Sequence, residues 1–178
     1  MKISRAILLA LSSILVVLFI WTADAAKGAK NVPIMEETEK GSQIVLPEFL
    51  DAALQAEFPG ARLPALSEFS PTMLEYYNSR LIGIHPAVAW GDFNGDKKQD
   101  FVFLLVTGQS SWGPQVELIV FNGESKRDFT SYRLGEVYNF KEDYVSFLDQ
   151  KLYKGRYKKG GWYINWNKKN KTYDVTKS

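Results

Sequence analysis

The sequence contains no cysteine, and only one of its 178 residues is a histidine, His85. These absences exclude disulfide bonds, thiol nucleophiles, zinc–cysteine sites, a lipid-modified cysteine and any metal centre built on a histidine pair. The charge is nearly balanced, with 22 Lys and Arg against 20 Asp and Glu, so no overall field indicates a nucleic-acid partner. A hydrophobic fraction of 46% nevertheless allows one domain with a substantial core.

The N-terminal segment has the layout of a secretory signal peptide. A short basic segment precedes an apolar run over residues 6–21, and the small residues Ala23 and Ala25 follow it. We therefore predict a signal peptide over residues 1–25 and an exported mature protein, periplasmic or extracellular, for which no nucleic-acid partner is expected. The alternative is an uncleaved anchor, because the run is close to the lower limit of about 17 residues for a membrane-spanning helix. After cleavage no membrane span is expected.

The mature chain divides into a polar leader, expected to be flexible, over residues 26–44 and one domain over residues 45–178. Apolar residues recur at spacings of three and four from Leu46 to Phe58, which predicts a short helix. A second short helix is predicted from the capping residue Ser70 to about Arg80.

The rest of the domain has the pattern of β-strands. Because the helices come first and the strands second, we predict an α+β fold with two short N-terminal helices packed on one face of a mainly antiparallel sheet. Strands are expected at residues 101–106, 116–121, 129–134, 162–166 and 172–175.

One loop has a composition suited to an ion. Oxygen-bearing side chains occupy positions one, three, five and nine of a loop that begins at Asp92, and calcium prefers six to eight such ligands. The alternative is that the same side chains form Asx turns with no ion bound. The candidate ligands are Asp92, Asn94, Asp96, the carbonyl of Lys98, and Asp100.

The stretch from Trp90 to Leu105, rich in aspartate and running directly into an apolar strand, resembles the calcium loop of FG-GAP and VCBS repeats. A wider segment from Phe58 to Leu105 resembles small exported bacterial proteins with a single loop of this type. The resemblance implies an FG-GAP-like loop at residues 91–101 that holds one structural Ca²⁺ ion, without a propeller, which needs several copies. The chain departs from the family pattern at Lys97, where glycine is usual. A positive φ there would cost a lysine about 1 kcal/mol.

Residues 151–178 contain nine basic residues and one acidic residue, with aromatic residues between them. This composition suits an anionic polymer or lipid head groups. The alternative is that the aromatic residues join the core while the lysines face solvent and protect a sheet edge. The candidate residues for an anionic surface are Lys158, Lys159, Trp162, Lys168 and Lys169.

The leading interpretation is a non-enzymatic exported binding or structural module stabilised by one calcium ion. An envelope-directed hydrolase and a binder of anionic surfaces are the alternatives, and the partner would be an anionic envelope polymer or a protein. The sequence nominates no catalytic residue, because acidic pairs are defined in space and not by spacing.

Overall fold

The computed structural model describes residues 31–38, 41–80, 82–125 and 127–178. Residues 34–178 form one compact unit, and every element given below belongs to it. The predicted signal peptide lies outside the described residues. Within the described ranges, no helix combines the length and the apolar composition needed to cross a membrane.

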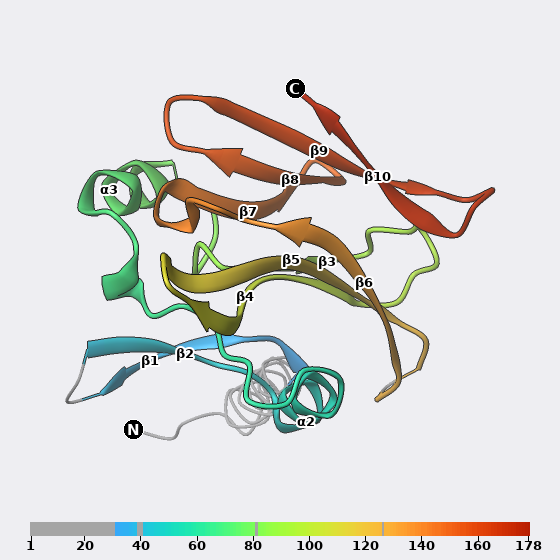
Figure 1. The fold of residues 1–178 in the computed structure, drawn as a ribbon. Helices are drawn as coiled ribbons and strands as arrows, with labels where there is room; N and C mark the ends of the chain where they lie inside the picture. The colour runs from blue at the N-terminus through green and yellow to red at the C-terminus, as the bar shows by residue number, and fades with distance from the viewer. Residues whose placement is uncertain (1–30, 39–40, 81, 126) are drawn as a thin grey trace, which may run out of the picture. The chain divides into compact units, whose positions relative to one another are not determined.

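The described strands form three antiparallel sheets (Figure 1). Strands β1 (Ile34–Thr38) and β2 (Gly41–Val45) make a hairpin. The β3–β6 sheet contains β3 (Val88–Gly91), β4 (Asp100–Ser110), β5 (Gly113–Gly123) and β6 (Phe129–Glu136), in that order. The β7–β10 sheet contains β7 (Asp143–Leu148), β8 (Lys151–Arg156), β9 (Gly160–Asn167) and β10 (Thr172–Lys177), also in chain order.

The predicted α+β class is wrong, because the described part of the chain is mostly β. Helices are present where the pattern predicts them, at α2 (Glu48–Glu57) and α3 (Pro71–Ser79), and the Ser70 Oγ caps α3 by accepting from the Met73 N–H at 3.2 Å. Two short 3-10 helices, η2 (Leu66–Glu68) and η3 (Phe140–Glu142), are also present. The strands dominate because the sequence contains five that the pattern did not reveal, β1, β2, β3, β7 and β8.

Strands β4 and β5 are buried on both faces over most of their length, which explains their long apolar runs. One face of β4 presents Phe101 and Phe103 to a cluster that includes Leu50 and Leu54 of α2. The opposite face presents Val102 and Leu104 to a second cluster, which includes residues of α3 and of the β7–β10 sheet. The two helices therefore cover opposite faces of the β3–β6 sheet, not one face as predicted.

The β3–β6 and β7–β10 sheets share an apolar core and meet at β3 and β7 (Figure 1). Just before β3, the carbonyl of Pro86 accepts a hydrogen bond from the Val145 N–H of β7 at 2.9 Å. At the other edge, β6 contacts β10. The result is a two-sheet arrangement with one main-chain seam, which we call the β3–β7 seam.

The β1–β2 hairpin lies within residues 26–44 and their border, where the sequence predicts a flexible leader. Ile44 and Leu46 pack against the cluster under α2, so this segment contributes apolar surface to the domain. In each of these two strands the alternating pattern covers only five residues, and about half of them are polar. By sequence the segment therefore resembles an unstructured one.

Candidate functional site

The acidic loop connects β3 to β4, and Asp92 organises its first half. The Oδ1 of Asp92 accepts hydrogen bonds from the backbone N–H groups of Gly95 at 2.7 Å and Asp96 at 3.0 Å, and its Oδ2 accepts from the Lys97 N–H at 2.9 Å. One carboxylate therefore holds three successive amides in a tight turn.

Asn94 and Asp96 continue the same pattern. The Oδ1 of Asn94 accepts from the Asp96 N–H at 2.9 Å, and the Oδ1 of Asp96 accepts from the Lys98 N–H at 2.8 Å. The turn places Lys97 at a φ of 67°. This is the positive φ that the sequence analysis gave as a source of strain for a lysine at this position. The ammonium of Lys98 lies 3.6 Å from the Oδ2 of Asp96.

Asp100, the first residue of β4, is fully buried. Its Oδ2 accepts from the Phe93 N–H at 2.7 Å, and its Oδ1 accepts from the Gly123 N–H of β5 at 2.9 Å. Burial raises the pKa of Asp100 to about 6, and the nearby charge of Asp96 acts in the same direction, against the amide donors. Within the described residues no Lys, Arg or His pairs with Asp100.

The loop has the donor chemistry of a hard-cation site, although its carboxylates are not grouped closely enough to share an ion. Carboxylate and amide oxygens suit calcium, and an oxygen that accepts one N–H retains a second lone pair. Yet no three His, Cys, Asp or Glu side chains in the described ranges are placed to share an ion. The structure brings Asp92, Asn94 and Asp96 together through Asx turns, whereas Asp100 faces the amide of β5, and Lys98 contributes its N–H and ammonium.

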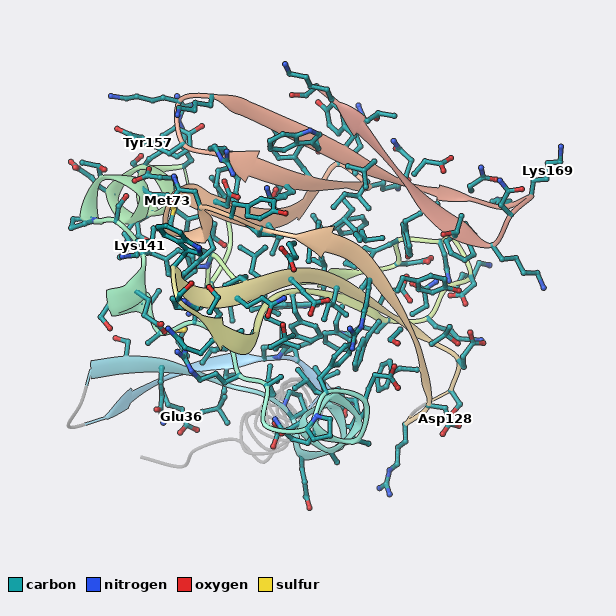
Figure 2. The ribbon with its side chains drawn as sticks, in the orientation of Figure 1. Glu36, Met73, Asp128, Lys141, Tyr157 and Lys169 are labelled. Atoms are coloured by element: carbon teal, nitrogen blue, oxygen red, sulfur yellow. The ribbon has the colours of Figure 1, made fainter. Side chains whose placement is uncertain are left out.

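The basic residues predicted to form an anionic surface do not form one patch. Lys158 and Lys159 lie in the turn between β8 and β9, and Lys168 and Lys169 lie in the turn between β9 and β10. These turns are separated by the length of β9, roughly 25 Å at about 3.3 Å per residue. Figure 2 shows the separation, with Tyr157 and Lys169 at opposite ends of the β7–β10 sheet.

The fifth candidate, Trp162, belongs to a cluster that the sequence did not reveal. The carboxylate of Asp143 is fully buried and binds two cations: the Lys154 ammonium at 2.8 Å and the Arg156 guanidinium, through Nε at 2.5 Å and Nη2 at 3.0 Å. The Lys154 ammonium also lies 4.4 Å from the centre of the Trp162 ring. Recognising this cluster requires the β7–β8 pairing, which sets Asp143 opposite Arg156.

A pocket of about 320 Å³ opens beside this cluster, between β6 and strands β8 to β10. Its lining combines apolar side chains with three charged ones. The lining residues are Leu118, Leu134, Gly135, Glu136, Val137, Tyr138, Lys154, Arg156, Trp162 and Val175.

The single histidine belongs to the core. The Nδ1 of His85 accepts the Ala87 N–H at 3.1 Å, and its carbonyl accepts the Tyr77 hydroxyl at 3.0 Å. Burial lowers the pKa of His85 to about 4, so the imidazole is neutral at pH 7. Its burial and these hydrogen bonds account for His85 as a structural residue.

Comparison with family models, with curated proteins and with solved structures finds no match in any of the three. The resemblance of the acidic loop to FG-GAP and VCBS loops therefore stays a prediction.

Proposed function

We propose that the protein is an exported, non-enzymatic binding or structural module whose acidic loop, residues 92–100, is stabilised by one calcium ion. The observation that supports this most directly is Asp100, a buried carboxylate at the root of the loop with a raised pKa and no cationic partner among the described residues. A divalent cation beside it and Asp96 would offset the repulsion between the two charges.

The candidate ligands are Asp92, Asn94, Asp96 and Asp100, with the carbonyl of Lys98. Hydrogen bonds from backbone amides to Asp92 and Asp100 already fix the loop and hold the candidate ligands near one another. An ion therefore needs to bind only the lone pairs of these residues that point outward. Lys98 competes for Asp96, which favours a modest affinity.

A thermal-unfolding experiment tests the ion. With a dissociation constant of about 10⁻⁴ to 10⁻³ M, as in weak extracellular modules, 10 mM calcium stabilises the native state by about 1.4 to 2.7 kcal/mol. We expect a melting temperature several degrees higher in calcium chloride than in sodium chloride of equal ionic strength. Asp96→Asn should remove the gain, and Glu75→Gln, an exposed acidic residue of α3, should retain it.

The ion proposal fails if calcium leaves the melting curve of the wild-type protein unchanged. It fails equally if Asp96→Asn shows the full gain, because the effect would then come from calcium bound elsewhere. Magnesium is the selectivity control, since it demands octahedral geometry at shorter distances and should stabilise the loop less than calcium.

Export has a separate test. The full-length gene is expressed in a bacterium with a C-terminal tag, and the periplasmic fraction is analysed by intact mass. We expect a protein that lacks residues 1–25. A cytoplasmic protein, or a membrane-bound one with an intact N-terminus, would contradict export of a cleaved form.

The hydrolase alternative gains no support from the described residues. Among the buried ionisable side chains, His85, Asp100 and Asp143 each make hydrogen bonds or ion pairs that account for their positions. The pocket beside β6 contains one carboxylate, Glu136, so it offers no acidic pair.

A further inference from the structure

Along the β7–β10 sheet, the side chains on the inward face change from apolar to charged and aromatic. Val145, Leu152 and Ile164 belong to the shared core. Further along, Lys154 faces Trp162 across the β8–β9 pair, and Asp143 faces Arg156 across the β7–β8 pair. Directly opposed residues in an antiparallel pair project to the same side. A charged, aromatic region therefore continues the apolar core into the pocket.

The ion cluster at this end has more donors than acceptors. Asp143 provides one carboxylate for two cations, and it engages the Nε and Nη2 of Arg156 and one position of the Lys154 ammonium. An ammonium has three hydrogens and a guanidinium has five. In the described ranges, no side chain or carbonyl accepts from the Nη1 of Arg156, and Asp143 is the one acceptor for Lys154.

Three other charged groups near the cluster affect its electrostatic potential, but they do not accept hydrogen bonds from the unused donors of Lys154 and Arg156. Glu136, on the opposite wall of the pocket, accepts a hydrogen bond from the Gln115 side chain at 2.8 Å. Glu142 acts on Arg156 through its charge alone. Lys177, opposite Trp162 in the β9–β10 pair, adds a positive charge on the same face. The unused hydrogen-bond donors, and not a strong net charge, are the distinguishing feature.

We propose that this pocket binds a small amphipathic carboxylate, a class of ligand independent of calcium at the acidic loop. The apolar body packs against the lining residues Leu118, Leu134 and Val175, and the carboxylate takes the unused donors of Lys154 and Arg156. A volume of about 320 Å³ is at the small end for ligand pockets, which run from about 300 to 1,000 Å³, so the body is short. Trp162 closes one wall.

The carboxylate is preferred over other head groups for a geometric reason. Its two oxygens accept from a guanidinium and an ammonium at once, and charge-assisted hydrogen bonds of this kind are stronger than neutral ones. A neutral amide supplies one accepting oxygen and an unwanted donor. A cationic head group would meet Lys154 and Arg156 directly.

Calorimetric titration of the purified protein with octanoate, octanamide and octylammonium tests the proposal. Octanoate should bind with a dissociation constant below a millimolar, octanamide at least tenfold more weakly, and octylammonium not measurably. Trp162→Ala should weaken octanoate binding at least tenfold. The matched control, Tyr163→Ala, changes the next residue of β9, which faces away from Trp162, and should bind as the wild type does.

Charge is tested in the same way. Arg156→Gln should weaken octanoate binding at least tenfold, whereas Lys158→Gln removes one positive charge from the neighbouring turn and should change it less than twofold. Because Arg156→Gln also disturbs Asp143, Val175→Trp serves as a second variant: it fills the pocket from a partly exposed position and leaves the ion cluster intact.

Three results would overturn the proposal: no octanoate binding to the wild type at millimolar concentration, equal binding of octanoate and octylammonium, or unchanged octanoate binding in a folded Val175→Trp or Trp162→Ala variant. None of these outcomes bears on the acidic loop, so the two proposals fail independently.

Discussion

Acidification should reveal two buried groups whose effects on stability oppose each other. His85 has a folded-state pKa lowered from 6.5 to about 4 by burial, so the unfolded chain binds a proton more readily than the native protein. Stability from His85 is complete above about pH 6.5 and decreases as the pH falls towards 4. At 1.36 kcal/mol per unit, the loss is about 2.5 kcal/mol by pH 4.5.

Asp100 acts with the opposite sign. Its folded-state pKa is raised from 3.8 to about 6, so the native protein binds the proton more readily. The native state therefore gains about 2 kcal/mol from this group between pH 7 and pH 4.5. Together the two groups nearly cancel, and the wild-type protein should show little net pH dependence from them over this range.

Single substitutions separate the two effects. His85→Asn retains an acceptor for the Ala87 N–H and removes the titration, whereas Asp100→Asn removes the other titration. Urea unfolding at several pH values from 7 to 4.5 gives the free energy of unfolding of each variant. We expect His85→Asn to gain stability on acidification relative to the wild type, and Asp100→Asn to lose it.

The comparison with the wild type removes the contribution of every other titrating group. If the difference in the free energy of unfolding between the wild type and His85→Asn is constant from pH 7 to pH 4.5, the imidazole has the same pKa in the folded and unfolded states. Burial would then not control its pKa. A constant difference for Asp100→Asn would refute the same reasoning for the carboxylate.

Three further substitutions test local features of the fold. Lys97→Gly should raise the free energy of unfolding by about 1 kcal/mol in urea, whereas Lys97→Ala, equally strained at a φ of 67°, should not. Gly91→Ala should lower the free energy of unfolding by about 1 to 3 kcal/mol, because the new Cβ would overlap the ring of Phe147. Adding Phe147→Leu should recover part of this loss. If it recovers none, the strain does not come from contact with this ring. Asp143→Ala should lower the melting temperature strongly, with a loss of about 3 to 5 kcal/mol, since it leaves two clustered cations without their acceptor; a loss below 1 kcal/mol would mean that the cluster contributes little.

The sequence predicted the elements whose signals are local. The helix at α3 has a capping serine followed by proline, and the strands at β4 and β5 have long apolar runs. The class was wrong because Asp143 to Arg156 alternates apolar, polar and glycine residues weakly, and its two-residue turn at Asp149 and Gln150 contains no glycine or asparagine. Both turn residues nevertheless adopt positive φ, as this type of hairpin requires.

The candidate site was predicted only where it is continuous in sequence. The turn from Asp92 to Lys98 follows from Asx chemistry, and the structure contains the hydrogen bonds of Asx turns there. The hydrogen bond from the Gly123 N–H to Asp100 depends on a pairing partner 23 residues away, and the cluster of Asp143 with Lys154 depends on the register of β7 and β8. Pairings of this kind are properties of the tertiary structure, which spacing alone does not show.

The β3–β7 seam has a consequence for motion. The two sheets are tied by a main-chain hydrogen bond at this edge, whereas β6 and β10 contact each other at the opposite edge, beside the pocket. Amide protons of β6 and β10 should therefore exchange with solvent through small local openings, and those of β4 and β7 only through global unfolding. We therefore expect the pocket mouth to widen on this edge while β4 and β7 keep their hydrogen bonds, which would let the proposed ligand enter without global unfolding.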